Sequence, residues 1–151
     1  MDNTFTRFET HPAGGLQPSA DTPQEAFSTG DQTELDFPYF ADDNGVSAGV
    51  WECAPSRMVF DQYPVHEMMT ILSGSVTLTS LDDDRIETFT AGDTFFVAKG
   101  TRFVWEITET LRKYYFISAC PPPATGRPKP PNRSDRVSRT PAAAAPFVFP
   151  L

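Results

Sequence analysis

The stretch Asp61-Gln-Tyr-Pro-Val-His-Glu-Met-Met-Thr-Ile-Leu-Ser-Gly74 joins a polar turn to a short apolar run that ends at a glycine. Its first seven residues contain two carboxylates, a phenol and one of the two histidines of the chain. Because successive side chains of a strand point to opposite faces, Glu67, Met69 and Ile71 are expected to share one face. The closing glycine is typical of a tight turn. The stretch therefore predicts a strand with a carboxylate on the same face as apolar residues.

Segments with β-branched and aromatic residues recur on both sides of this stretch, with turn residues between them. No segment has the sustained period of a long amphipathic helix. Connections of a few residues cannot make the crossovers that parallel strands need, so the strands are expected to pair antiparallel. The pattern predicts an all-β sandwich or closed barrel. The eight predicted strands lie within residues 45–54, 57–63, 67–74, 75–81, 85–92, 93–100, 101–109 and 111–119.

The length of 151 residues fits one domain with polar ends. Residues 1–35 show no sustained period and are expected to form an extended N-terminal arm, with one helical turn in TPQEAF at 22–27. Residues 36–120 are expected to form the barrel. Residues 121–151 are rich in Pro and Ala and predict an extended tail. Its apolar end, FVFPL at 147–151, is either free or docked on the body or on a second subunit.

The chain carries 12 basic and 20 acidic residues, for a formal net charge of −8. Such a charge repels phosphate backbones, so we expect no nucleic-acid partner. There is no apolar run long enough to cross a membrane and no signal-peptide pattern, so we expect no membrane partner and a cytoplasmic location. Cys53 and Cys120 lack metal-ligand spacing and are expected to be reduced, with a disulfide between them as the alternative.

Two spaced motifs in the body carry a family resemblance. Glu67-x6-Gly74 and Gly92-Asp93-x4-Ala98-x-Gly100 resemble the two sequence motifs of the cupin superfamily. Further blocks narrow the resemblance to the small single-domain branch similar to the cupin domain of (S)-ureidoglycine aminohydrolase. They are GVWECAPSR at 49–57, AGDTFFVAKGTRFVWE at 91–106 and LRKYYFI at 111–117. The resemblance covers residues 45–118 and implies a jelly-roll-like double-stranded β-helix barrel that forms a homodimer.

The resemblance also bears on metal binding. In that superfamily the motifs supply three histidines and one glutamate to a metal ion, and here only the glutamate, Glu67, is present. Asp61, Tyr63 and Phe103 stand at the histidine positions. Transition metals prefer imidazole and thiolate ligands, whereas two carboxylates favour harder ions. We therefore expect no tightly bound cofactor; a divalent metal, if it binds, would use Glu67 and Asp61.

The resemblance turns the Glu67 face into the barrel, and Asp61 and Tyr63 are expected to point the same way. A carboxyl group that is desolvated in an apolar barrel is suited to exchange a proton near neutral pH. Glu67 is therefore the expected catalytic acid or base, with Asp61 and Tyr63 beside it. The structural alternative is an ion pair between Glu67 and an inward-facing Lys113 or Arg102.

Aromatic and apolar residues on the same strands are candidates for a ligand pocket, and the simpler alternative is that they fill the core. The expected lining residues are Trp51, Met69, Phe103, Trp105, Lys113 and Tyr115. His66, next to Glu67, is expected to point outward, which favours a surface or dimer-contact role.

These residues predict a small-molecule enzyme of the cupin type that has no tightly bound transition metal and uses Glu67 for acid/base chemistry on a small metabolite. Lyase, isomerase or cyclase, and hydrolase reactions all fit the pattern. One alternative is a cupin that binds a small ligand and catalyses no reaction. Another is a metal-dependent hydrolase or aminohydrolase, or an isomerase or cyclase of a biosynthetic pathway. A Glu67→Gln variant separates an enzyme, which loses turnover, from a binding protein.

Overall fold

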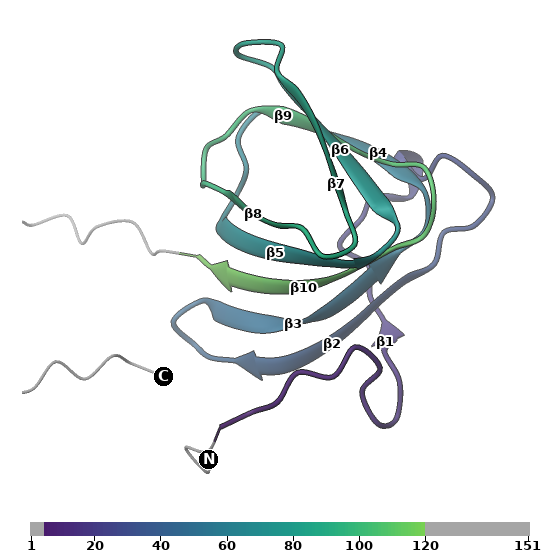
Figure 1. The fold of residues 1–151 in the computed structure, drawn as a ribbon, viewed down its shortest axis with the longest axis vertical. Coiled ribbons are helices and arrows are strands. Elements are labelled where there is room, and N and C mark those ends of the chain that lie inside the picture. The colour runs from purple at the N-terminus through teal and green to yellow at the C-terminus, as the bar shows by residue number, and fades with distance from the viewer. Residues whose placement is uncertain (1–4, 120–151) are drawn as a thin grey trace, which may run out of the picture. The chain divides into compact units, whose positions relative to one another are not determined.

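The computed structural model describes residues 5–119, and this part of the chain is built from antiparallel strands (Figure 1). One sheet has six strands in the order β1-β2-β3-β10-β5-β8, and the other has four in the order β4-β9-β6-β7. The antiparallel all-β fold predicted from the sequence is confirmed. No helix within residues 5–119 is long and apolar enough to cross a membrane. The elements are β1 Gln17–Pro18, the 3-10 turn η1 Gln24–Ala26, β2 Glu34–Ala41, β3 Val46–Cys53, β4 Ser56–Phe60, β5 His66–Ser73, β6 Ser75–Ser80, β7 Ile86–Thr90, β8 Thr94–Val97, β9 Phe103–Ile107 and β10 Leu111–Ser118.

Each of the eight predicted segments overlaps one strand, from β3 to β10, and β4 and β5 begin one residue before their segments. Strands β1 and β2 are additional to the eight predicted strands, and Pro38 lies near the centre of β2. Proline is uncommon inside paired strands because it has no N–H to donate. Strand β1 pairs with β2 only at Leu35 and Asp36, and the β2–β3 pairing shifts register between Pro38 and Phe40. Pro38 therefore occupies a position without a β1 partner, next to an irregularity, where a proline is tolerated.

The core lies between the two sheets, and the alternation of each strand places its apolar side chains there. On β9, Phe103, Trp105 and Ile107 are buried, and the residues between them are partly exposed. On β5 the same alternation buries Met69 and Ile71, at 0% and 1% exposure, as the sequence predicts. Full burial of one such aliphatic side chain contributes about 1.5–3 kcal/mol to stability.

The turn between β5 and β6 depends on Gly74, which the sequence marks as a turn residue. Its backbone has a φ of 78°, a left-handed conformation that favours glycine. A Cβ built at this position would lie 2.4 Å from the carbonyl oxygen of Thr110. A larger residue would therefore push the end of β5 away from the segment that leads into β10.

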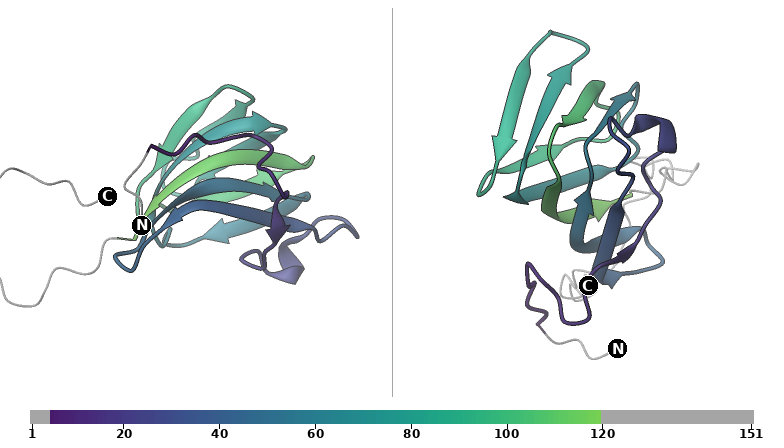
Figure 2. Two further views of the ribbon diagram at one scale, coloured as in Figure 1. Left: turned by 90° about the horizontal axis from the view of Figure 1, so that it is seen from below. Right: turned by 90° about the vertical axis from the view of Figure 1, so that its right-hand side faces the viewer.

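The N-terminal segment lies along the outer face of the six-stranded sheet (Figure 2). The ring of Phe8 stacks on Tyr39 with centroids 4.5 Å apart, and the Tyr114 hydroxyl donates to the Phe8 carbonyl at 3.2 Å. Arg112 donates to the carbonyl of Thr10 at 2.8 Å. The helical turn predicted in TPQEAF is confirmed as η1, preceded by a proline and without a side-chain cap. The segment from residue 6 onward is thus packed on the body of the fold.

Of the two cysteines, Cys53 lies within the described residues. Cys53 is fully buried on β3, with its Sγ 3.8 Å from the hydroxyl groups of Thr22 and Ser56. Burial raises the pKa of its thiol, which keeps the group protonated and unreactive at neutral pH. The predictions on Cys120, on the tail at 121–151 and on its apolar end fall outside the described residues.

Candidate functional site

A cavity of about 850 Å³ lies between the two sheets. Its walls come from β2, β3, β5 and β10 on one side and from β4 and β9 on the other, and the β4–β5 connection and residues 21–26 of the N-terminal segment complete it. Four of the six predicted pocket residues line it, namely Trp51, Trp105, Lys113 and Tyr115. Its size is that of a site for a small organic molecule.

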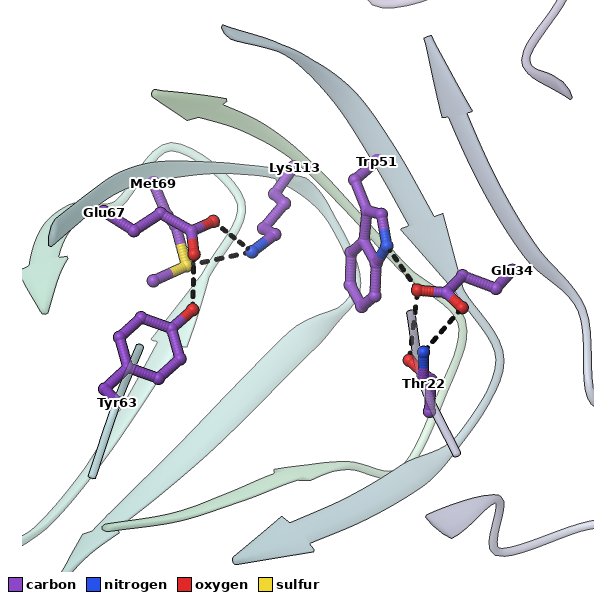
Figure 3. A network of polar contacts seen from close by, with 7 residues as sticks. All are labelled: Thr22, Glu34, Trp51, Tyr63, Glu67, Met69 and Lys113. Carbon is purple, nitrogen blue, oxygen red and sulfur yellow. Dashed lines mark hydrogen bonds and ion pairs between the residues drawn. The ribbon is translucent and has the colours of Figure 1, made fainter. Parts of the chain in front are cut away.

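Glu67 on β5 and Tyr63, two of the predicted catalytic residues, also line this cavity, and Glu67 is at the centre of a buried polar cluster in its wall (Figure 3). Lys113 on β10 donates to its Oε1 at 2.7 Å, and the hydroxyl of Tyr63 donates to its Oε2. Lys113 also contacts Met69, with Nζ 3.1 Å from Sδ. Glu67, Lys113 and Tyr63 are 4%, 6% and 9% exposed. Both carboxylate oxygens of Glu67 are therefore engaged by donors inside the barrel.

The register of the sheet explains how Lys113 reaches Glu67. Lys113 pairs with Ile71, whereas Glu67 pairs with Ile117, so the two side chains begin two inward-facing positions apart. The long stem of Lys113 covers this separation and passes Met69, whose sulfur it contacts. An ion pair between distant parts of the chain thus forms along one face of two neighbouring strands.

The Lys113 ammonium also lies against two indole rings. Its Nζ is 4.9 Å from the ring centroid of Trp51 and 5.0 Å from that of Trp105. The two rings are T-shaped to each other, with centroids 6.5 Å apart. A cation within about 6 Å of an indole ring is attracted by the quadrupole of that ring. The charge of Lys113 is therefore balanced by one carboxylate and two aromatic faces.

Tyr63 acts as a neutral hydrogen-bond donor in this cluster. Burial raises the pKa of its phenol, and the charge of the Glu67 carboxylate raises that pKa further. Both effects keep the hydroxyl protonated at neutral pH. The ion pair that the sequence offered as the structural alternative for Glu67 is present, with Lys113 as the cation. Arg102, the other cation considered, pairs instead with Asp82 at 2.9 Å on the surface.

A second buried carboxylate lies on the other side of Trp51 (Figure 3). Glu34 on β2 is 4% exposed and accepts a hydrogen bond from Trp51 Nε1 at 2.8 Å. The backbone N–H of Thr22 donates to its Oε2 at 2.9 Å, and the Thr22 hydroxyl donates to its Oε1 at 3.1 Å. These bonds fix the indole of Trp51 and attach the N-terminal segment to the cavity wall.

Asp36, two residues further along β2, also lines the cavity. Burial raises the pKa of its carboxyl group more than the hydrogen bond from Tyr115 lowers it. Burial likewise raises the pKa of the Tyr115 phenol, and the Asp36 charge adds to that rise. Gly49 makes room for this pair, because a Cβ there would lie 2.7 Å from the Tyr115 hydroxyl. Within residues 5–119, the buried side-chain atoms that lack a hydrogen-bond partner are Asp36 Oδ1 and Trp105 Nε1, and both residues line the cavity.

Two predicted site residues are in different places from those expected. Asp61 points to solvent, with its side chain 87% exposed and its Oδ1 3.9 Å from Arg102 Nη2. The reason is the strand alternation, because Phe60 is the last inward-facing residue of β4 and the next position faces outward. Phe103 is buried, but it packs on Phe60 and Tyr63, with centroids 5.1 and 5.2 Å away, outside the cavity lining.

Met69 and His66 lie on opposite sides of the sheet. Met69 lies in the core under Lys113 and touches its ammonium, although it is not part of the cavity lining. His66 points outward as predicted: its ring stacks on Phe96 with centroids 6.0 Å apart, and its Nδ1 accepts a hydrogen bond from the Lys99 backbone. Thr22 and Glu34 were missed because residues 1–35 were expected to form the arm, and Asp36 was missed although it lies within the predicted barrel. The alternation in TELDFPYF at 33–40 is the signal that could have found them.

The sequence profile of the EutQ-like cupin domain matches residues 40–115. The chain belongs to the EutQ-like cupin family. The predicted membership of the cupin superfamily is thereby confirmed, and the narrower likeness to ureidoglycine aminohydrolase stays a prediction. No protein with a curated description matches this chain.

Solved structures are similar to parts of this EutQ-like cupin. A protein of unknown function of the DUF861 family from Pseudomonas syringae pv. tomato is 25% identical, with a TM-score of 0.65 over 74% of this chain and 46% of that one. This chain therefore spans less than half of the Pseudomonas protein. A DUF861 family protein from Thermotoga maritima is 32% identical over 44% of this chain and 73% of its own, with a TM-score of 0.40. A putative ethanolamine utilization protein Q from Salmonella typhimurium is 15% identical over 59% of this chain and 72% of its own, with a TM-score of 0.49.

The residues of this EutQ-like cupin do not fit a transition metal at the histidine positions of the wider superfamily. Asp61 faces solvent, Phe103 has no donor atom, and Tyr63 is a protonated phenol. The Oε1 atom of Glu67 is bonded to the ammonium of Lys113. No group of three or more His, Cys, Asp or Glu side chains within residues 5–119 is arranged to hold a metal ion. A cation already stands beside Glu67, and it belongs to the protein.

Proposed function

We propose that this EutQ-like cupin binds a small organic molecule in the cavity between its sheets, with no transition metal in the site. The observation that carries the proposal is the cavity of about 850 Å³, whose wall is formed by Trp51, Trp105 and Tyr115. Sites for small molecules are concave and mostly apolar, with a few placed polar groups, and this cavity has that character.

The lining favours a ligand with a ring or another flat apolar part. Indole and phenol rings stack on such groups and keep an N–H or O–H for a specific contact. On the same side as Trp105, Met58 and Phe60 of β4 add further apolar surface. Asp36 and Tyr115 supply the polar end, so a ligand with a hydrogen-bond donor at one end is favoured.

A thermal-shift screen of small metabolites on the full chain tests the binding proposal. The matched variants are Ile117→Trp, which adds an indole to the cavity wall, and Ile86→Trp, which adds one to a 67% exposed position on β7. We expect a ligand to raise the Tm of wild type and of Ile86→Trp. It should not change the Tm of Ile117→Trp, because the added indole fills the cavity. Stabilisation of all three proteins by the same amount would contradict the proposal.

Acid/base catalysis by Glu67 is the second candidate, favoured by the contact between its Oε2 and the Tyr63 hydroxyl. A carboxylate beside a phenol and an ammonium can relay a proton in a buried site. We place it second because both oxygens of Glu67 are already engaged, so a substrate must displace one donor before it can exchange a proton. The aminohydrolase chemistry of the branch that the sequence resembles ranks behind both, since it relies on metal ligands that this chain replaces.

Once a ligand is found, Glu67→Gln separates the two candidates. An enzyme loses turnover of the ligand and keeps most of its affinity, whereas a binding protein shows no conversion in either form. The readouts are product formation by mass spectrometry and affinity by calorimetry. Tyr63→Phe is the milder companion variant, because it removes only the hydroxyl that donates to Glu67.

A further inference from the structure

Four side chains surround Lys113 Nζ. Glu67 Oε1 lies 2.7 Å away and Met69 Sδ 3.1 Å away. The ring centroids of Trp51 and Trp105 lie at 4.9 and 5.0 Å. We call Glu67, Met69, Trp51 and Trp105 the ammonium cage.

The chemistry of the cage is that of ammonium recognition. One carboxylate oxygen and one thioether accept N–H groups, and two indole faces attract the positive charge without directional bonds. A primary ammonium has three N–H groups on a compact charge, which suits two acceptors and two aromatic faces. We propose that the ammonium cage is a binding site for a primary ammonium group, which this chain fills with its own Lys113 in place of a metal ion at Glu67.

The same set of atoms is poor for other cations. A divalent transition metal needs about four nitrogen, oxygen or sulfur ligands, and the cage offers one carboxylate oxygen and one thioether. The second oxygen of Glu67 is bonded to Tyr63. A quaternary ammonium has no N–H to give to either acceptor. The cage therefore distinguishes a primary ammonium from a metal ion and from a fully alkylated amine.

Removal of the resident ammonium gives a direct test. Lys113→Ala keeps Cβ and deletes three methylene carbons and the nitrogen, which are the atoms of n-propylammonium. We expect n-propylammonium chloride to raise the Tm of Lys113→Ala by about 5 °C at ten times its Kd. It should not change the Tm of wild type. It should also not change the Tm of Lys113→Met, because the methionine side chain fills the space of the lysine stem. Calorimetry should show one site in Lys113→Ala alone.

Three additives at matched concentration separate the cage from general solvent effects. They are 1-propanol, which has the stem without the charge; tetramethylammonium chloride, which has the charge without N–H groups; and potassium chloride, which controls for ionic strength. None should stabilise Lys113→Ala as n-propylammonium does. Equal stabilisation by 1-propanol or by potassium chloride, or an equal response of wild type, would overturn the proposal.

Two further measurements keep the proposal testable if Lys113→Ala folds poorly. Its refolding yield from urea should rise with n-propylammonium and not with 1-propanol, and equal yields would count against the cage. Elemental analysis of tag-free wild type after incubation with zinc chloride should find well below one zinc per chain. About one zinc per chain, lost in Glu67→Ala, would mean that a metal and not Lys113 occupies the cage. Because Glu67, Trp51 and Trp105 also line the cavity, wild type is the control that separates the two proposals: n-propylammonium bound elsewhere in the cavity would stabilise wild type as well.

Discussion

Two buried carboxylates stand on either side of Trp51, equally hidden from solvent and held in different ways (Figure 3). Glu67 is bonded to an ammonium and a phenol, whereas Glu34 is bonded to a backbone N–H, a hydroxyl and an indole N–H. The partner of Glu67 comes from the last strand of the barrel, and the main partner of Glu34 comes from the N-terminal segment. A barrel can therefore bury a carboxylate either against a countercharge or against neutral dipoles, and the two solutions respond differently to mutation.

The largest effect is expected where a countercharge is removed. Lys113→Met should destabilise the protein by about 3–5 kcal/mol in urea unfolding, because it leaves the Glu67 charge buried without its cation. Adding Glu67→Gln to Lys113→Met should recover much of that loss, since the double variant buries no charge. The exposed pair of Arg85 and Glu87 is the matched control, and Arg85→Met should change stability by no more than about 1 kcal/mol. If the stability losses of Lys113→Met and Glu67→Gln simply added in the double variant, the two residues would not be energetically coupled and the prediction would be wrong.

A smaller effect is expected at the carboxylate held by neutral donors. Glu34→Gln replaces one carboxylate oxygen with an NH2 group. Oε2 accepts from the Thr22 N–H, and Oε1 accepts from the Thr22 hydroxyl and the Trp51 N–H, so at least one donor loses its acceptor. We expect a loss of about 1–3 kcal/mol and a shift in the fluorescence of Trp51, whose indole N–H is bonded to Glu34. A loss as large as that of Lys113→Met would show that the two carboxylates are held alike.

The third carboxylate, Asp36, gives the mildest and most pH-dependent effect. Its pKa is raised from 3.8, chiefly because burial disfavours the charged form. A carboxyl group with a raised pKa in the folded state contributes stability below its unfolded pKa and loses that contribution as pH rises through its folded pKa. Asp36→Asn should therefore match wild type in Tm below pH 3.8 and exceed it at neutral pH. A Tm difference that stays constant across this range would speak against burial as the cause.

The sequence predicts the fold and one of the two carboxylates. Glu67 is placed by its spacing to Gly74 and by strand alternation. Trp51 and Lys113 are placed by the family-like blocks at 49–57 and 111–117. Alternation is also why Asp61 was misplaced, because the turn around Pro64 breaks the count of residues between β4 and β5. The alternation at 33–40 could have placed Glu34 on a strand face, but its bonds to Thr22 depend on where residues 19–22 fold back onto the sheet, and no local pattern encodes that contact. Local periodicity gives faces of strands, whereas contacts made by irregular segments require the tertiary arrangement.

Strand β10 is the last strand of the barrel along the chain, yet it lies between β3 and β5 in the sheet. On the ribosome, β3 and β5 are complete once Ser73 has been made, but both keep an unpaired edge until Ser118 emerges. At about 5–20 residues per second, the remaining synthesis leaves these edges open for roughly 2–9 s. Open strand edges invite pairing with other chains, so nascent molecules are most prone to aggregate in this interval. Arrival of β10 ends it, since the same strand closes both edges and delivers Lys113 to Glu67.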